Sequence, residues 1–423
     1  MDLSSNKPLA FDLPLNTARP LIMHIDLNSC FAIIEQQANP LYRHRPVAIA
    51  AYNSPSGAII ASSYEAKALG IKLGINVRDA KLIYPGVIIL TPDPPKYREA
   101  HKRFKKILLR FTNNVRPKSI DEFEIDFSGS QVLRNGRKLE DIGLDIKQLI
   151  KQEIGDYITV NVGIGTNRFW AKTAAGLHKP DGLDVMDAGN ARDIYDTLKL
   201  TDLTGINVRY EARLNALGVH TPLQFLDKTS IFLRRQVFKS KIGFDWYCRL
   251  RGWEADNVVW GRKSFGHTYA LGQKTTDKQV LSRLLMKLCE KTGRRLRSSN
   301  YIAGGIYLSV LFENQTYWAK GRKTHSPIYA TQDIYLHAQQ LLNQIIIPAK
   351  VTNLAVSVYN LVPACPWQAS LFEGTRLDNR SLADTCDEIN DKFGEFVITP
   401  AIMMGMDNLI LDRVAFGGTN IIN

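Results

Sequence analysis

The sequence predicts a mixed α/β (α+β) protein in which two α/β regions flank an all-helical one. Strand-sized apolar runs alternate with amphipathic segments over residues 21–185, whereas residues 190–255 contain no good strand signal. Residues 264–362 then follow the order strand-helix-strand-strand-helix-strand, which is that of a ferredoxin-like unit. With 423 residues, the chain is long enough for two to four domains.

The first α/β region begins with the apolar strand 21–27, which ends near the carboxylate of Asp26. The segment from Lys96 to Val115 predicts a long amphipathic helix, and nine Lys or Arg residues lie between Lys96 and Lys118. A solvated helix face explains these cations as well as a nucleic-acid contact does. The other expected elements are helices at 31–37, 64–69, 80–83, 144–155 and 169–177, strands at 46–50, 58–62, 87–90 and 158–164, and a strand–turn–strand segment at 119–127.

The second α/β region follows a short basic link at residues 258–263. Its expected elements are strands at 265–270, 301–312, 317–321 and 351–359, and helices at 277–299 and 331–345. Residues 363–423 begin with prolines and read as an appended tail. At the other end, residues 1–20 contain three prolines and no apolar signal-peptide core, so we expect a loose leader.

Composition narrows the class of protein. The 54 Lys and Arg residues exceed the 41 Asp and Glu residues and give a formal net charge of +13. This surplus favours a polyanionic partner, because each phosphate that a cation neutralises releases counterions. A basic enzyme with another substrate is an equally good explanation of charge alone.

Cysteine usage and hydropathy exclude two further classes. The five cysteines are far apart and form no C-x-x-C pair, which argues against a disulfide framework and against a cysteine zinc site. A reducing, cytoplasmic location fits this usage. No apolar run is as long as a membrane span, so we expect no membrane partner.

Three carboxylates carry the main chemical signal. Asp26 ends a strand, and Asp121 and Glu122 lie at the apex of the predicted strand–turn–strand segment 119–127. Successive side chains of a strand point to opposite faces, so two adjacent carboxylates can reach one ion only at a bend or hairpin tip. Gathered carboxylates require cations, and hard divalent ions prefer their oxygens. Seen alone, however, an Asp-Glu pair is more often an ordinary acidic turn.

Four motifs accompany these carboxylates. They are His24-Ile25-Asp26-Leu27-Asn28-Ser29-Cys30-Phe31-Ala32, then Ser119-Ile120-Asp121-Glu122 with Asp126, then residues 162–168 with 171–175 and 179–182, and finally Lys263-Ser264-Phe265-Gly266-His267. In this order, over residues 21–362, they resemble the motifs of the Y family of translesion DNA polymerases, and most closely its bacterial branch. One such motif would be weak, but four in the family's order are specific.

The resemblance implies a role for each matching residue. Asp26, Asp121 and Glu122, with the backbone carbonyl of Leu27, would hold two Mg²⁺ ions, for which Mn²⁺ is the expected substitute. Phe31 matches the steric gate, a ring placed where a ribose 2′-hydroxyl would sit, and a core phenylalanine is the alternative. The residues that match the clasp of the incoming triphosphate are Tyr64, Lys67 and Lys172.

Three positions depart from the family pattern, and none of them is one of the three carboxylates. Asn28 stands where most relatives have Asp, and Ala61 stands where relatives often have a hydroxyl. Lys67 stands where many relatives have Arg. Lysine keeps the charge but loses the bidentate fork, so we expect nucleotide affinity to differ.

Further matches imply contacts with DNA. Residues 203–219 resemble a helix-hairpin-helix whose turn at Gly205 and Asn207 would aim backbone amides at a phosphate, although a plain helical turn is the alternative. Asn207 stands where a second glycine is usual, and asparagine tolerates the left-handed conformation. The region 264–362 matches the little-finger domain of the family, and its cations that we expect to contact DNA are Arg294, Arg295, Lys320 and Arg322.

The tail contains Trp367-Gln368-Ala369-Ser370-Leu371-Phe372. Gln368, Leu371 and Phe372 resemble the short peptide by which bacterial polymerases grip the sliding clamp, with two apolar anchors filling a groove on the partner. The alternative is a tail segment packed on its own domain.

The resemblance as a whole implies a monomeric right-hand DNA polymerase that acts on primer–template DNA and a deoxynucleoside triphosphate (dNTP), releases pyrophosphate, and has low fidelity without proofreading. The implied domains are a ferredoxin-like palm (21–37 and 95–185), small fingers (38–94), an all-helical thumb (186–256), a ferredoxin-like little finger (264–362) and the tail (363–423). Two alternatives remain, a catalytically silent scaffold bound to the clamp and a general single-strand binder.

Overall fold

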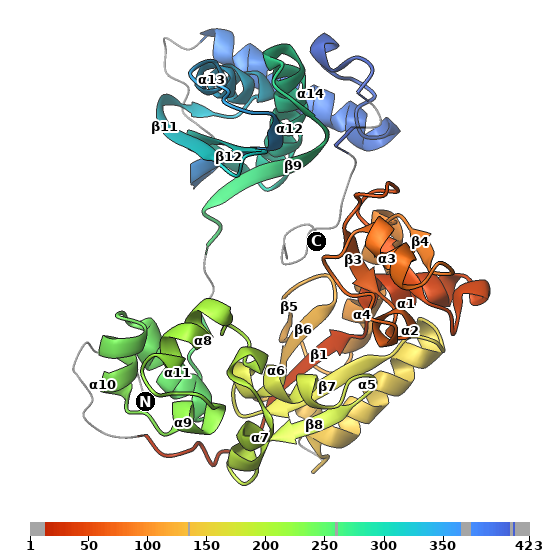
Figure 1. The fold of residues 1–423 in the computed structure, drawn as a ribbon, viewed down its shortest axis with the longest axis vertical. Helices are drawn as coiled ribbons and strands as arrows, with labels where there is room; N and C mark the ends of the chain where they lie inside the picture. The colour runs from red at the N-terminus through yellow and green to blue at the C-terminus, as the bar shows by residue number, and fades with distance from the viewer. Residues whose placement is uncertain (1–12, 134–135, 259–260, 365–373, 407–408, 411–423) are drawn as a thin grey trace. The chain divides into compact units, whose positions relative to one another are not determined.

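The computed structural model describes the chain except for residues 1–12, 134–135, 259–260, 365–373, 407–408 and 411–423. The chain divides into two compact units, the first ending at Val258 and the second running from Val259 to Asp412. Both units mix sheets with helices (Figure 1), so the predicted α/β class is confirmed. No helix in the described part of the chain is long and apolar enough to cross a membrane.

A five-stranded central sheet organises the first unit. Its strand order is β5-β6-β1-β7-β8, and β1 is antiparallel to both β6 and β7. The strands are β1 (Ile22–Leu27), β5 (Val115–Pro117), β6 (Glu122–Asp126), β7 (Val160–Gly165) and β8 (Leu183–Met186). The predicted helix 96–115 ends earlier, as α4 (Pro94–Leu108), because Val115 pairs with β6 at the sheet edge.

The two faces of the central sheet differ. Apolar side chains such as Ile25, Phe123 and Val162 form one face and pack in a single core with α4 and α5 (Leu139–Glu153). Helix α6 (Arg168–Leu177) covers the opposite face. Its approach is so close that a Cβ atom at Gly163 would lie 2.1 Å from the backbone oxygen of Ala171. A glycine at position 163 is therefore what allows α6 to lie on the sheet.

A small sheet follows α1 (Cys30–Ala38). Strand β2 (Val47–Ala50) is antiparallel to β3 (Ile59–Ser62), which confirms the two strands predicted at 46–50 and 58–62, and parallel to β4 (Ile88–Leu90). The short helices α2 (Tyr64–Ala68) and α3 (Val77–Ile83) complete this subdomain. Its own core is built from alanine, valine and isoleucine side chains.

Residues 190–255 are all described and none of them forms a strand, so the predicted all-helical region is confirmed. Its α-helices are α7 (Ala191–Thr197), α8 (Val208–Asn215), α9 (Pro222–Leu226), α10 (Ser230–Phe232) and α11 (Ile242–Leu250). They enclose an aromatic core that includes Phe225, Phe238 and Trp246. This core also takes in Trp170 of α6, so the helical region and the central sheet share packing.

The described end of the leader, residues 13–20, is not loose, and that expectation is wrong for these residues. The side chains of Leu13 and Leu15 pack against the core of the helical region. The backbone amide of Leu13 donates to the Tyr247 hydroxyl at 2.8 Å, and Trp253 Nε1 donates to the Pro14 carbonyl at 2.8 Å. Sequence pattern missed this segment because its partners lie more than 230 residues away.

The second unit contains a four-stranded antiparallel sheet and confirms the predicted order of strands and helices. The elements are β9 (Ser264–Thr275), α12 (Lys278–Ser298), β10 (Tyr301–Phe312), β11 (Tyr317–Ile328), α13 (Thr331–Asn343) and β12 (Val351–Pro363). The sheet order is β11-β10-β12-β9, so the last strand lies between the first two. Strands β9, β11 and β12 extend beyond their predicted ends, because cross-strand pairing continues where the apolar pattern stops.

The described part of the tail is integrated into the second unit, which corrects the expectation of an appended segment. Helix α14 (Gly374–Phe393) presents Asp387 to Arg297 of α12, with a hydrogen bond of 2.9 Å from Arg297 Nη2. Farther along, the buried Lys287 ammonium donates to the Met406 carbonyl at 2.6 Å. The tail therefore covers one side of α12 and uses several of its cations.

Candidate active site

Strand register brings the three predicted carboxylates to one end of the central sheet. Asp26 on β1 lies directly opposite Glu122 on β6. The Leu27 amide donates to the Asp121 carbonyl at 2.9 Å, which places Asp121 in the turn that precedes β6. Ser119 Oγ stabilises this turn, because it donates to the Asp121 carboxylate and accepts the Glu122 amide at 3.0 Å. Asp121 and Glu122 thus lie at a hairpin tip, as the sequence predicted.

Two lysines lie against these carboxylates. Lys172 Nζ, from α6, is 2.8 and 2.7 Å from the two carboxylate oxygens of Glu122. Lys179, from the loop that follows α6, forms an ion pair with Asp26. Lys172 was predicted from the motif, whereas no role was predicted for Lys179, although it opens the segment 179–182 of the third block. Paired ammonium groups show that the site attracts cations.

Burial and neighbouring charges shift the acid strengths of the site in different directions. Burial raises the pKa of Asp26 and, with Asp26 and Glu122 nearby, that of Asp121. Burial would also raise the pKa of Glu122, but His24 and the two lysines outweigh it, so that pKa is lowered. The surroundings therefore disfavour the ionised forms of two carboxylates, Asp26 and Asp121.

The donor chemistry of the site fits divalent metal ions. Asp26, Asp121, Glu122 and the Leu27 carbonyl offer hard oxygen ligands at one end of the sheet, which suit Mg²⁺. Among the described residues, however, no three His, Cys, Asp or Glu side chains are grouped closely enough to hold an ion. The acidic side chains turn instead toward Ser119 and the lysines. Metal binding here requires the carboxylates to exchange their ammonium partners for metal.

The predicted nucleotide-binding residues of α2 lie beside the start of α1. Lys67 Nζ donates to Ser29 Oγ at 2.7 Å and lies 4.6 Å above the ring of Tyr64. The Tyr64 hydroxyl accepts a hydrogen bond from Asn28 Nδ2 at 3.4 Å. Burial is the main cause that raises the pKa of Tyr64, and the charge of Asp26 raises it further. Burial lowers the pKa of Lys67, and the charge of Asp26 partly offsets this lowering. The small sheet thus carries these two groups to the carboxylates.

Asn28 is a connecting residue that sequence reasoning treated only as a departure. Its side chain is 1% exposed, and Nδ2 donates to Asn161 Oδ1 at 2.8 Å. Its Oδ1 accepts the Asp181 amide at 2.9 Å. Asn28 therefore fixes the loop from which Lys179 reaches Asp26. The available signal was its place two residues after a catalytic-type aspartate.

Phe31 lies in the first turn of α1, five residues after Asp26. It is 1% exposed and stacks on Tyr97 of α4, with ring centroids 4.4 Å apart. The structure thus gives this ring a core position on the helix that follows the strand of Asp26. A contact with a sugar stays a prediction.

The turn proposed to bind a DNA phosphate lies between a 3₁₀ turn (Leu200–Asp202) and α8. Gly205 has a φ of +103°, which favours glycine at that position. Asn207 has a φ of −98° and is not left-handed, so the conformational argument for it is wrong. It instead caps α8, and its side chain accepts the amides of Arg209 and Tyr210. The turn survives because Asn207 is a good N-cap.

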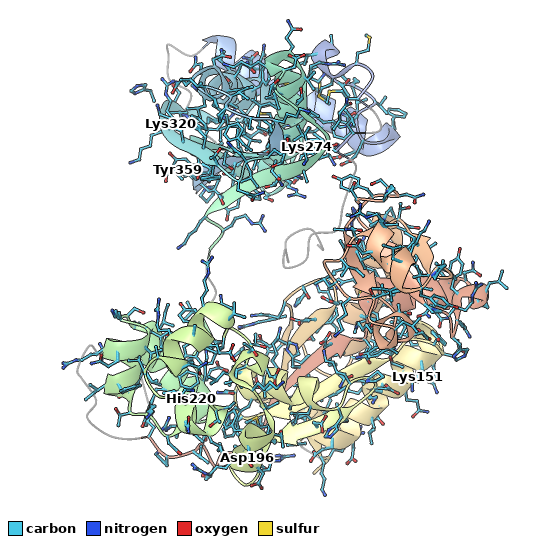
Figure 2. All side chains as sticks on the ribbon, viewed as in Figure 1. Lys151, Asp196, His220, Lys274, Lys320 and Tyr359 are labelled. Atoms are coloured by element: carbon cyan, nitrogen blue, oxygen red, sulfur yellow. The ribbon has the colours of Figure 1, made fainter. Side chains whose placement is uncertain are left out.

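The four predicted cations of the second unit are in two different settings. Lys320, labelled in Figure 2, is exposed on the edge strand β11 and contacts Gln344 at 2.8 Å. Arg322 is exposed on the same strand and contacts Gln340 at 2.8 Å. Their cross-strand partners are the buried Leu308 and Ile306, so both cations lie on the helix-covered side of the sheet.

Arg294 and Arg295 of α12 differ from Lys320 and Arg322 in being half-buried, and both are bonded to protein groups. Arg294 Nη2 lies 2.7 Å from Asp391 of the tail, and Arg295 Nη1 donates to the Gly266 carbonyl at 3.3 Å. The structure therefore makes these two residues weaker candidates for DNA binding than Lys320 and Arg322. The predicted clamp peptide, Gln368, Leu371 and Phe372, lies outside the described residues.

Comparisons with known proteins agree with this arrangement. The model of the impB/mucB/samB family matches residues 25–176, and the model of that family's C-terminal domain matches residues 262–371. A DNA polymerase IV of Moorella thermoacetica is 33% identical over 396 residues, which are 90% of this chain and 96% of the relative. The chain belongs to the Y family of DNA polymerases. A DNA polymerase IV of Pelotomaculum thermopropionicum is similarly close, with 32% identity over 93% of this chain and 97% of the relative.

Solved structures of Y-family polymerases share the fold. A Y-family DNA polymerase chimera aligns with a TM-score of 0.71 at 25% identity, over 81% of this chain and 99% of the chimera. A ternary complex of a related polymerase aligns over the same shares with a TM-score of 0.55 at 25% identity. The chain is therefore a right-hand polymerase in architecture, with sequence relatives that are bacterial DNA polymerases.

Proposed function

We propose that this Y-family polymerase extends a primer on damaged templates by nucleotidyl transfer that depends on two Mg²⁺ ions held by Asp26, Asp121, Glu122 and the Leu27 carbonyl. The single observation that carries the proposal is the register that sets Asp26 opposite Glu122, with Asp121 in the adjoining turn. When bound, the ions would lower the pKa of the primer 3′-hydroxyl and neutralise the triphosphate.

The protein's own groups would position the reactants. On metal binding, Lys172 would leave Glu122 and remain within reach of the triphosphate, where an ammonium group offsets phosphate charge. Lys67 and Tyr64 would bind the triphosphate from the opposite side, and Phe31 would exclude a ribose 2′-hydroxyl. Burial of the carboxylates strengthens each of these charge interactions, since it lowers the local dielectric constant.

The proposed domains follow the two units. The central sheet would be the palm, the small sheet the fingers, the helical region the thumb and the second unit the little finger. Gly205 and Asn207 in the thumb, and chiefly Lys320 and Arg322 in the little finger, would contact DNA phosphates. We expect such binding to be independent of sequence and to weaken steeply with salt.

The partners and setting follow from the same proposal. They are primer–template DNA and a dNTP, and the neighbours include a ternary complex. We further propose that Gln368, Leu371 and Phe372 bind a bacterial sliding clamp, and that the enzyme works as a cytoplasmic monomer. Replacing Leu371 and Phe372 with Ala should abolish stimulation by the clamp while leaving primer extension without the clamp unchanged.

Primer extension with Mg²⁺ tests the catalytic proposal. Wild type should extend a primer, Asp121→Ala should not, and Asp156→Ala, which removes an exposed carboxylate of the same unit, should extend normally. An inert wild type would favour the silent scaffold. DNA affinity that is indifferent to dNTP and to a primer end would favour the single-strand binder.

A further inference from the structure

A buried ion cluster lies one helical turn away from the carboxylate site. Its centre is the Arg168 side chain at the start of α6, which is 7% exposed. Arg168 Nε donates to the buried Glu124 carboxylate, and Nη1 lies 2.5 Å from Glu254. Lys118 gives Glu124 a second cation at 3.2 Å, and Asp126 lies 3.8 Å from Arg168. One guanidinium thus bridges two carboxylates from distant parts of the chain.

The cluster and the carboxylate site repeat the same pairing. Glu122 and Glu124 alternate along β6 and therefore share one face of the sheet. Arg168 and Lys172 are four residues apart on α6 and therefore share one face of the helix. Arg168 pairs with Glu124, and Lys172 pairs with Glu122. The position of the first pair along the strand consequently determines where Lys172 lies relative to Glu122.

Glu254 connects this pairing to the helical region. It belongs to the segment that follows α11. The backbone carbonyls of this segment accept hydrogen bonds from the residues that precede α6. Thr166 Oγ1 donates to the Gly252 carbonyl at 2.8 Å, and Asn167 Nδ2 donates to the Trp253 carbonyl at 2.9 Å. Glu254 also accepts the Arg168 backbone amide at 3.4 Å, where the positive end of the helix dipole favours an anion.

The chemistry of the cluster makes its geometry specific. A buried guanidinium needs its carboxylate partners, because removing one partner leaves an uncompensated charge. The planar fork of arginine can satisfy two carboxylates at fixed angles, whereas a lysine offers one point charge. Because Lys172 is part of α6, a shift of this helix along the sheet would change the position of Lys172 relative to Glu122.

We propose that Arg168 is a positioning residue for nucleotidyl transfer. By bridging Glu124 of β6 and Glu254 of the segment that leaves the helical region, it fixes α6 in the register that holds Lys172 opposite Glu122. The inference rests on the proposed role of Lys172 at the triphosphate. In this proposal Glu254, in the segment that follows α11, also supports nucleotide binding through Arg168.

Steady-state primer extension by the full-length protein tests this inference. Arg168→Lys keeps the charge but loses the fork, and it should raise the KM for dNTP about tenfold while the primer–template Kd changes less than about twofold. Glu254→Gln should raise the KM for dNTP about threefold. The control is Arg192→Gln, which removes an exposed arginine that pairs with Asp227 in the same unit, and it should leave the KM unchanged.

A double-mutant cycle with Lys172→Ala identifies the route of the effect. In that background Arg168→Lys should raise the KM further by less than about twofold, because the residue it positions is gone. Thermal destabilisation of Arg168→Lys with an unchanged KM, or an undiminished KM effect in the Lys172→Ala background, would overturn the inference alone. An unchanged KM in Lys172→Ala itself would overturn the proposed role of Lys172 and the inference together.

Discussion

Asp26 and Glu122 face each other across two antiparallel strands, β1 and β6. Because side chains alternate along a strand, a slip of one residue would move Glu122 to the apolar face of the sheet. The apolar residues that flank it, such as Phe123 and Ile125, prevent this slip by filling the core on that face. Core packing thus aligns the carboxylates.

We expect Asp121→Asn to abolish primer extension while raising stability. Burial and neighbouring carboxylates raise the pKa of Asp121, so its ionised form is disfavoured in the folded state. The neutral amide should therefore increase the free energy of unfolding by about 1 kcal/mol in EDTA. Urea denaturation and primer extension measure the two effects, with Asp156→Asn as the control for both. A loss of stability together with activity would contradict this expectation.

Phe31→Leu should relax the exclusion of ribonucleotides and also destabilise the palm. The ring is buried against Tyr97, so we expect a loss of about 1–3 kcal/mol in the free energy of unfolding. Tyr97→Leu removes the same stacking contact from the other side and is the matched control. If both variants incorporate ribonucleotides equally, Phe31 is a core residue and not the steric gate.

Leu15→Ala should destabilise the first unit, because this side chain packs on the helical region. A half-buried leucine predicts a loss of about 1–2 kcal/mol in the free energy of unfolding. The control is Leu41→Ala, at a leucine that is 75% exposed, and it should change the same quantity by less than about 0.5 kcal/mol. Thermal unfolding that is equal in wild type and Leu15→Ala would restore the view of a loose leader.

The second unit should lose stability in mild acid through His267. Burial, followed by the charges of Arg295 and Lys291, lowers the pKa of His267 from 6.5 to about 3. Below pH 6.5 the unfolded chain therefore binds a proton that the folded state refuses. The free energy of unfolding should fall by about 1.4 kcal/mol per pH unit from this group, until the folded pKa is reached.

Urea denaturation of the full chain between pH 7 and pH 4 checks this slope. His267→Gln should flatten it for the transition of the second unit, whereas His325→Gln, at an exposed position of β11, should retain it. An unchanged slope in His267→Gln would assign the acid sensitivity to other groups.

The sequence determined more of the site than its composition suggests. A short apolar run predicted the strand that carries Asp26, and the strand–turn–strand pattern predicted the apex at Asp121 and Glu122, because both depend on neighbours along the chain. Helix ends were less accurate. The basic helix was extended to Val115, since amphipathic pattern cannot show that this residue pairs with a strand.

The errors share one physical cause. Residues 13–20 and the tail read as loose because their local sequence contains proline and polar residues, and their partners lie far away in the chain. A related case is Arg294, whose contact with DNA stays a prediction, and whose pairing with Asp391 of the tail the sequence pattern did not indicate. A cation's partner depends on what packs beside it, and sequence periodicity does not contain that information.

By itself, the sequence determined the family, the order of the elements and the identity of the three carboxylates, because these follow from local pattern and motif. Only the tertiary structure decided which cations pair with these carboxylates. Lys172 and Lys179 meet Glu122 and Asp26 because α6 crosses the sheet closely at Gly163, and Arg168 joins β6 to the exit of the helical region for the same reason. Contacts between distant segments depend on packing in three dimensions, which no spacing along the chain records.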